Sequence, residues 1–168
     1  MKRSKEFLPI LCILLFISCG SGNRAPDAAD ISRKDTLNIN IGTEPPTLDW
    51  SLATDVTSFT IIENIMDGLA AFDEKYEPVP ALARSWRVSE DGRTYTFKIR
   101  EKVLWTDGVP LRAGDFLYSW KRILNPETAG SYAYFLFDVK NARKFNSGEI
   151  KDFAKVGIKA PDEHTLIV

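Results

Sequence analysis

The most informative segment of the chain reads Trp105-Thr106-Asp107-Gly108-Val109-Pro110-Leu111-Arg112-Ala113-Gly114-Asp115-Phe116. Asp107-Gly108 predicts a tight turn, and Pro110, whose φ is fixed, sets the direction of the chain as it approaches the next element. From Asp115 to Leu124, apolar residues recur at helical spacing until Asn125-Pro126 ends the pattern. The stretch therefore predicts a turn, a rigid proline and a helix in close succession.

Other elements are predicted on both sides of this stretch. Period-two alternation and turn residues predict strands at residues 36–41, 86–88 and 93–100 and a hairpin at 156–168. Helical spacing predicts helices at residues 59–68 and 132–145, the second with a break near Asp138. This mixture of elements indicates an α+β or α/β domain.

The C-terminal end of the chain is unusual. It reads Leu166-Ile167-Val168, which lies within an apolar strand and has no turn or polar tail behind it. Chain termini usually lie at the surface of a domain. We therefore expect a C-terminal truncation that leaves this strand open.

Charge and composition exclude several classes of function. The chain has 22 basic and 23 acidic side chains in 168 residues, a net charge of −1, and so lacks the basic excess of an electrostatic nucleic-acid binder. Two cysteines and the single His164 do not provide a zinc site. No hydrolase, metalloprotease or phosphate-loop motif is present. We predict no enzymatic activity, no metal site and no cofactor.

The first 18 residues are predicted to be a lipoprotein signal peptide. Basic residues precede an uncharged run from Phe7 to Ile17, which is too short to span a membrane, and Phe16-Ile17-Ser18-Cys19 resembles a lipobox. We expect Cys19 to carry the lipid and residues 19–35 to form a flexible tether, although an ordinary secretory signal remains the alternative. Removal of residues 1–18 takes away three basic side chains and one acidic side chain and leaves a net charge of −3. A polybasic membrane surface is therefore excluded.

The aromatic residues give weaker predictions. Trp86, Trp105 and Trp120 lie among apolar residues and are predicted to pack in the core. Trp50 follows Leu48-Asp49 in a loop, where packing or a place near a ligand cleft both fit. For Tyr132, ligand contact and simple packing are equally consistent with the residues alone.

Four segments in order resemble one family. They are Glu44-Pro45-Pro46-Thr47-Leu48-Asp49, the hairpin from Trp86 to Phe97, the stretch quoted above, and Asp115-Phe116 through Ser119-Trp120. Together they resemble the oligopeptide- and dipeptide-binding lipoproteins of ABC importers, extracellular solute-binding protein family 5. The segment from Asn125 to Ala133 is similar to the oligopeptide branch in particular.

The resemblance implies an α/β fold of the periplasmic-binding-protein type II kind, present here as an incomplete N-terminal fragment. Residues 36–66 would be the first strand and helix of the first domain, and residues 67–168 most of the smaller second domain. Family members bind the main chain of an extended peptide between two lobes. Carried over by position, the ligand contacts fall on Thr54, Asp55, Val56 and Tyr132. Arg112 departs from the family threonine that caps the helix, so this cap is expected to be lost.

The resemblance also implies partners and a location. An oligopeptide ligand, the permease subunits of an ABC importer, and a membrane reached through the lipid anchor are expected, which places the protein outside the cytoplasm, in the periplasm or at the cell surface. Two alternatives stay open: a binder of nickel, haem or an oligosaccharide on the same scaffold, and a surface lipoprotein without transport, such as a peptide-signal receptor or an adhesin.

Overall fold

The computed structural model of the chain describes residues 37–168. Residues 41–168 form one unit, and residues 37–40 belong to a second unit. The predicted signal peptide, Cys19 and the tether lie outside the described residues.

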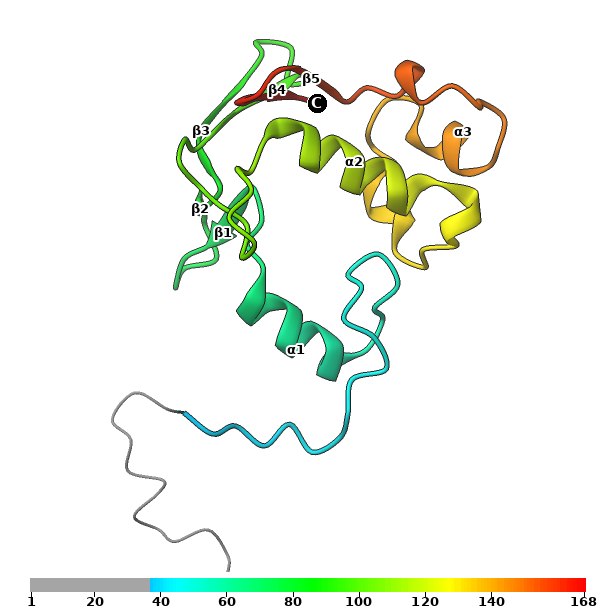
Figure 1. The fold of residues 1–168 in the computed structure, drawn as a ribbon. Coiled ribbons are helices and arrows are strands. Elements are labelled where there is room, and N and C mark those ends of the chain that lie inside the picture. The colour runs from blue at the N-terminus through cyan, green and yellow to red at the C-terminus, as the bar shows by residue number, and fades with distance from the viewer. Residues whose placement is uncertain (1–36) are drawn as a thin grey trace, which may run out of the picture. The chain divides into compact units, whose positions relative to one another are not determined.

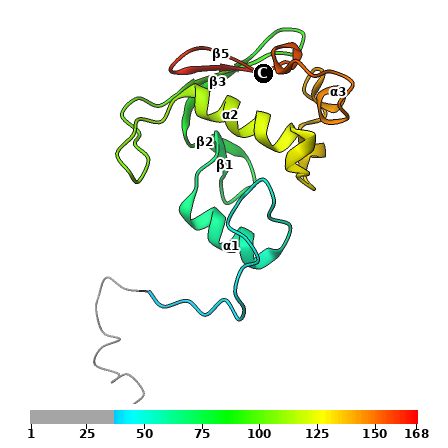
Figure 2. The ribbon, with the colours of Figure 1, turned by 45° about the vertical axis from the view of Figure 1, so that its right-hand side comes forward.

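The unit contains two antiparallel sheets (Figures 1 and 2). The smaller is a two-stranded ribbon of β1 (Ala70–Phe72) and β2 (Pro78–Pro80). The larger has the strand order β3-β4-β6-β5 and consists of β3 (Ala83–Val88), β4 (Tyr95–Ile99), β5 (Lys159–Asp162) and β6 (Thr165–Ile167). Gly92, at φ 69°, turns the chain between β3 and β4, as the Asp91-Gly92 pair predicts.

Residues 41–168 also contain three α-helices and three short 3-10 helices. The α-helices are α1 (Val56–Ile65), α2 (Ala113–Leu124) and α3 (Ala142–Asn146). The 3-10 helices are η2 (Pro126–Thr128), η3 (Ala133–Leu136) and η4 (Phe153–Lys155). The predicted helix at 132–145 is therefore two separate short helices, because Asn141 adopts a left-handed φ of 63° just before α3. None of the helices in residues 37–168 has the length and apolar content needed to cross a membrane.

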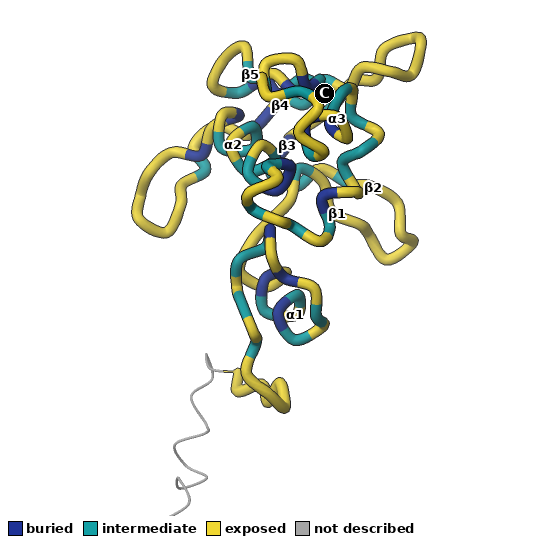
Figure 3. Tube along the Cα trace, turned by 90° about the vertical axis from the view of Figure 1, so that its right-hand side faces the viewer, coloured by how far each residue is buried: buried dark blue, intermediate teal, exposed yellow. Residues whose placement is uncertain are grey.

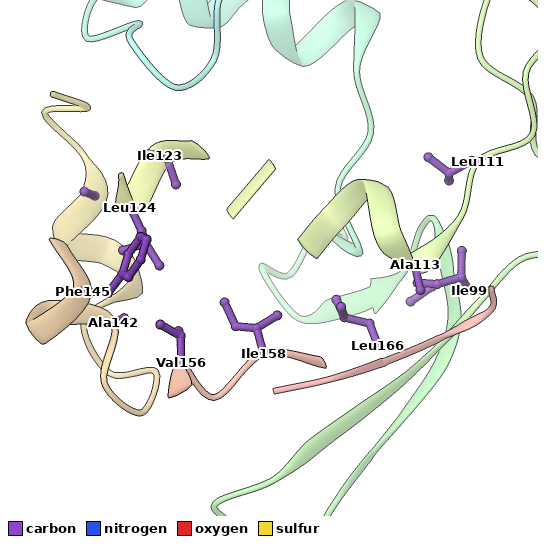
Figure 4. Close-up of a cluster of buried hydrophobic side chains, with 12 residues drawn as sticks. Ile99, Leu111, Ala113, Ile123, Leu124, Ala142, Phe145, Val156, Ile158 and Leu166 are labelled. Carbon is purple, nitrogen blue, oxygen red and sulfur yellow. The ribbon is translucent and has the colours of Figure 1, made fainter. Parts of the chain in front are cut away.

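The core lies between α2 and the larger sheet. α2 packs on β5 and β6, and Figure 4 shows buried side chains in a continuous row below it, from Ile99 and Ala113 through Leu166 and Ile158 to Leu124. Ile99, Ala113, Leu124 and Leu166 have no exposed surface. α1 is different, because only Ser58 and Ile62 are buried and the rest of its surface is partly or fully exposed (Figure 3).

Two predictions about strands are wrong. Residues 37–41 form no strand, and Leu37 is 81% exposed. A half-buried strand needs a neighbour to pair with, and alternation alone does not supply one. The last strand is also not open, because β6 lies between β4 and β5, and Val168 and Tyr95 exchange both backbone hydrogen bonds at 2.7 and 2.8 Å.

Candidate functional site

The loop from Asp49 to Asp55 connects the Leu-Asp segment to α1. Asp49 organises it, since its carbonyl oxygen accepts from the N–H groups of Leu52 and Ala53 at 2.9 Å and its carboxylate accepts from the N–H of Ser51 at 3.0 Å. Ser51 and Ala53 are each only 2% exposed. The loop therefore has a fixed path that ends with Thr54 and Asp55 at the start of α1.

Two side-chain interactions join this loop to α2. Arg122 donates to both carboxylate oxygens of Asp49, with 2.7 Å between Nη1 and Oδ1. The hydrogen bonds and positive charge of Arg122 lower the pKa of Asp49 below its usual value of 3.8. One residue further on, Trp50 Nε1 donates to Ser119 Oγ at 3.0 Å. Trp50 is thus half-buried and tied to α2.

The same loop also touches the segment that follows α2. A Cβ atom at Gly130 would lie 2.8 Å from the carbonyl oxygen of Ser51, so only glycine fits at this contact without a shift of the backbone. Gly130 is two residues before Tyr132. The contact therefore holds the segment that contains Tyr132 close to the loop.

Asp55 is the N-cap of α1. Its carboxylate accepts from the hydroxyl of Ser58 at 2.7 Å and from the backbone N–H of Ser58 at 2.9 Å. These hydrogen bonds lower the pKa of Asp55 below 3.8. Because the carboxylate is occupied in this way, a ligand contact at Asp55 would use the main chain.

Tyr132 and Thr54 lie together although they are 78 residues apart in the sequence. The Tyr132 hydroxyl donates to the Thr54 carbonyl oxygen at 3.2 Å, and its ring stacks on Phe59 of α1 at a centroid distance of 6.0 Å. The hydroxyl oxygen keeps lone pairs that can accept a further hydrogen bond. Within the described residues, the backbone N–H groups of Thr54 and Val56 have no acceptor. Two main-chain donors and a hydroxyl acceptor for a polar main chain are thus brought together by the contact between Tyr132 and Thr54.

Sequence reasoning missed an aromatic cluster beside Tyr132. The rings of Tyr134 and Phe135 lie 6.0 and 5.6 Å from the ring of Tyr132 and 4.5 Å from each other. Tyr134 is 52% exposed and Phe135 is 69% exposed. The run Tyr-Ala-Tyr-Phe could have indicated this cluster. Because the run was interpreted as part of a helix, its aromatic rings were not predicted to be exposed.

The three tryptophans predicted to pack in the core differ from one another. Trp86 and Trp120 are half-buried, Trp86 against Phe97 and Trp120 against the core. Trp105 is 44% exposed, so its predicted burial is wrong. It follows Leu104, which forms an isolated bridge with Pro110 outside the named strands, and its indole N–H donates to Asp115 Oδ2 at 3.2 Å.

The helix cap expected to be lost at Arg112 is replaced in part. Arg112 is the N-cap of α2, and a guanidinium group cannot accept a hydrogen bond. Asp115 instead accepts from the backbone N–H of Arg112 at 2.8 Å, and its negative charge lies in the first turn of the helix. Arg112 itself pairs with Glu163 at 2.9 Å.

No group of three or more His, Cys, Asp or Glu side chains among residues 37–168 is arranged to hold a metal ion. The site is therefore defined by main-chain polar groups, one tyrosine hydroxyl and aromatic rings. An arrangement of this kind suits the binding of a polar chain with apolar side groups.

Comparison with solved structures gives the class of protein. The substrate-binding domain of an oligopeptide ABC transporter from Bacillus anthracis superposes with a TM-score of 0.72 at 43% identity, over 74% of this chain and 24% of that chain. Listeria monocytogenes OppA bound to peptide superposes with a TM-score of 0.71 at 34% identity, over 74% of this chain and 25% of that chain. The fold is thus that of part of an extracellular solute-binding protein.

Sequence comparison gives the family. The profile of bacterial extracellular solute-binding proteins, family 5 Middle, matches residues 77–168, which is more than half of the chain. The oligopeptide-binding protein OppA of Bacillus subtilis (strain 168) is 38% identical over 173 aligned residues, which cover 100% of this chain and 32% of OppA. The chain belongs to solute-binding protein family 5, and the predicted family is confirmed. It spans about a quarter to a third of the length of the relatives it matches.

Proposed function

We propose that this chain forms part of the substrate-binding component of an ABC-type peptide importer. In this proposal the protein is not an enzyme. It captures oligopeptides outside the cytoplasm and delivers them to permease subunits in the membrane. The family assignment supports a solute-binding role, and one observation carries the peptide specificity: the hydrogen bond from Tyr132 to Thr54, beside the unpaired N–H groups of Thr54 and Val56.

The chemistry of a peptide main chain fits this arrangement. An extended peptide presents N–H and C=O groups in alternation, and it binds to exposed main-chain groups largely irrespective of its side chains. The N–H groups of Thr54 and Val56 would donate to peptide carbonyl oxygens, and the Tyr132 hydroxyl would accept from a peptide N–H. Asp55 would contribute through its main chain, because its carboxylate caps α1.

The proposal includes the remaining sequence predictions. Cys19 would carry the lipid anchor after removal of residues 1–18, and residues 19–35 would be the tether. Residues 36–66 would belong to the first domain of a two-lobed fold of periplasmic-binding-protein type II, and residues 67–168 to the second domain. The residues described here would then supply one wall of the peptide site.

Amide NMR of the chain, titrated with peptide, tests the proposal. A pool of tri- to pentapeptides is expected to shift the amide signals of Thr54, Val56 and Tyr132. Since one wall encloses little of the ligand, we expect an affinity weaker than about 1 mM. Nickel, haem and maltotetraose are the comparison ligands. Shifts at these residues with one of the comparison ligands and none with peptides would overturn the proposal.

A further inference from the structure

A cavity lies between α1 and the first half of α2, and neither Thr54 nor Tyr132 lines it. Its volume is about 420 Å³, within the range of small-molecule sites. Five aromatic rings line it, from Trp50, Phe59, Trp105, Phe116 and Trp120. A cavity of this size and lining suits a compact organic molecule with an apolar body.

Two of the tryptophan rings are fixed by hydrogen bonds to α2. Trp50 Nε1 donates to Ser119 at 3.0 Å, and Trp105 Nε1 donates to Asp115 at 3.2 Å. Ser119 and Asp115 are four residues apart and therefore share one face of the helix. Since both indole N–H groups are occupied, these rings offer a ligand their faces and carbon edges, and the face of an indole ring attracts cations.

Every charged residue that lines the cavity is acidic. These residues are Glu63 in the last turn of α1, Asp67 two residues beyond its end, and Asp115 on α2, while no lysine or arginine among the described residues lines it. Glu63 and Asp67 are exposed and form no ion pair within residues 37–168. The C-terminal end of α1 adds the negative end of the helix dipole and has no basic residue in its last turn.

We propose that this cavity binds a small hydrophobic organic cation, an ammonium or quaternary ammonium group on an aromatic or branched alkyl body. The aromatic faces would hold the apolar body and the charged group, and the three carboxylates would select a cation over a neutral or anionic molecule of the same shape. The proposal does not rest on the proposed peptide function, because neither Thr54 nor Tyr132 lines the cavity. The two regions share only the Phe59 ring, which lines the cavity and stacks on Tyr132.

Ligand-observed NMR and calorimetry with the purified chain test the proposal. The probe is benzyltrimethylammonium, and the comparison molecules are neutral benzyl alcohol and anionic phenylacetate. We expect one-to-one binding of the cation, at least about tenfold tighter than either comparison molecule, and weaker at 0.5 M NaCl because salt screens the carboxylates. Equal binding of the three molecules, or no binding of the cation, would overturn the proposal.

Two double variants with the same change in charge locate the site. Glu63→Gln/Asp67→Asn changes two exposed side chains of the cavity, and we expect it to weaken binding of the cation about threefold or more. The control Glu74→Gln/Glu90→Gln alters two exposed acidic residues that do not line the cavity. Equal weakening by both variants would mean that the net charge of the protein attracts the cation. The assignment of the cavity as the binding site would then be wrong.

Two kinds of molecule carry this chemistry: a free organic amine and the lysine side chain of a peptide. A competition experiment adds acetyl-Ala-Lys-Ala-amide to the complex with benzyltrimethylammonium. Displacement of the probe by the peptide would support the proposal, with a lysine side chain as the natural ligand. Retention of the probe would support the proposal, with a free amine as the natural ligand.

Discussion

Gly130→Ala tests the contact that places Tyr132 beside the loop at Thr54. The added Cβ would lie 2.8 Å from the Ser51 carbonyl oxygen and 3.0 Å from Ile123 Cγ1, and the Ser51 oxygen belongs to a backbone held by Asp49. Overpacking of this kind costs about 1–3 kcal/mol. Alanine also restricts the unfolded chain, which stabilises the folded protein by about 0.4–1 kcal/mol. We expect a net loss of about 1–2 kcal/mol in the free energy of unfolding.

The assay is thermal unfolding followed by circular dichroism, with Gly114→Ala as the matched control. The loss at Gly130 corresponds to a fall in Tm of roughly 3–6 °C for a chain of this size. Gly114 lies in α2 with open space around its would-be Cβ, so the same substitution there should raise stability by about 0.5–1 kcal/mol. A Gly130→Ala protein as stable as the parent would refute the close approach of the loop to the Tyr132 segment.

Three further predictions concern the lipid anchor, the tryptophans and the ion pair of the loop. Cys19→Ser should abolish labelling by a palmitate analogue and release the protein from membranes; persistent labelling would contradict the lipoprotein prediction. Trp120→Ala should lower the free energy of unfolding by about 3 kcal/mol, the lower end for a tryptophan because the ring is half-buried, and Trp105→Ala by less, since Trp105 is 44% exposed; equal losses for the two variants in urea titrations would contradict this. Arg122 lowers the pKa of Asp49, so the stability from this pair is present above pH 3.8 and is lost as pH falls through the lowered pKa. Acid unfolding of Asp49→Asn should lack this component, and an unchanged pH profile would count against the pair.

The sequence predicted the elements whose signal is local. The helix at α2, the β3-β4 hairpin and the final hairpin follow from apolar periodicity and from turn residues such as Gly92. The ribbon of β1 and β2 was missed, because Pro78 and Pro80 argue against a strand in sequence. They are tolerated because β2 has only one neighbour and needs no N–H donors on its other side.

The candidate site was named through the family motif and not through residue patterns. Thr54 and Tyr132 were named from that resemblance, and the structure adds that they bond to each other. The ion pair of Asp49 with Arg122, and the approach of Ser51 to Gly130, join residues more than 70 positions apart and leave no local signal. Long-range contacts of this kind depend on the packed fold, so periodicity cannot reveal them.

Peptide affinity of Tyr132→Phe, measured by amide NMR titration with trialanine, tests the proposed ligand contact most directly. Tyr118→Phe is the control, since Tyr118 is 68% exposed and its hydroxyl makes no hydrogen bond within residues 37–168. Loss of one neutral hydrogen bond corresponds to roughly 0.5–1.5 kcal/mol, which is a two- to twelvefold weaker Kd. We expect this change for Tyr132→Phe and none for Tyr118→Phe. An unchanged Kd for Tyr132→Phe would contradict the claim that Tyr132 contacts the peptide and would leave its hydroxyl with a purely structural role at Thr54.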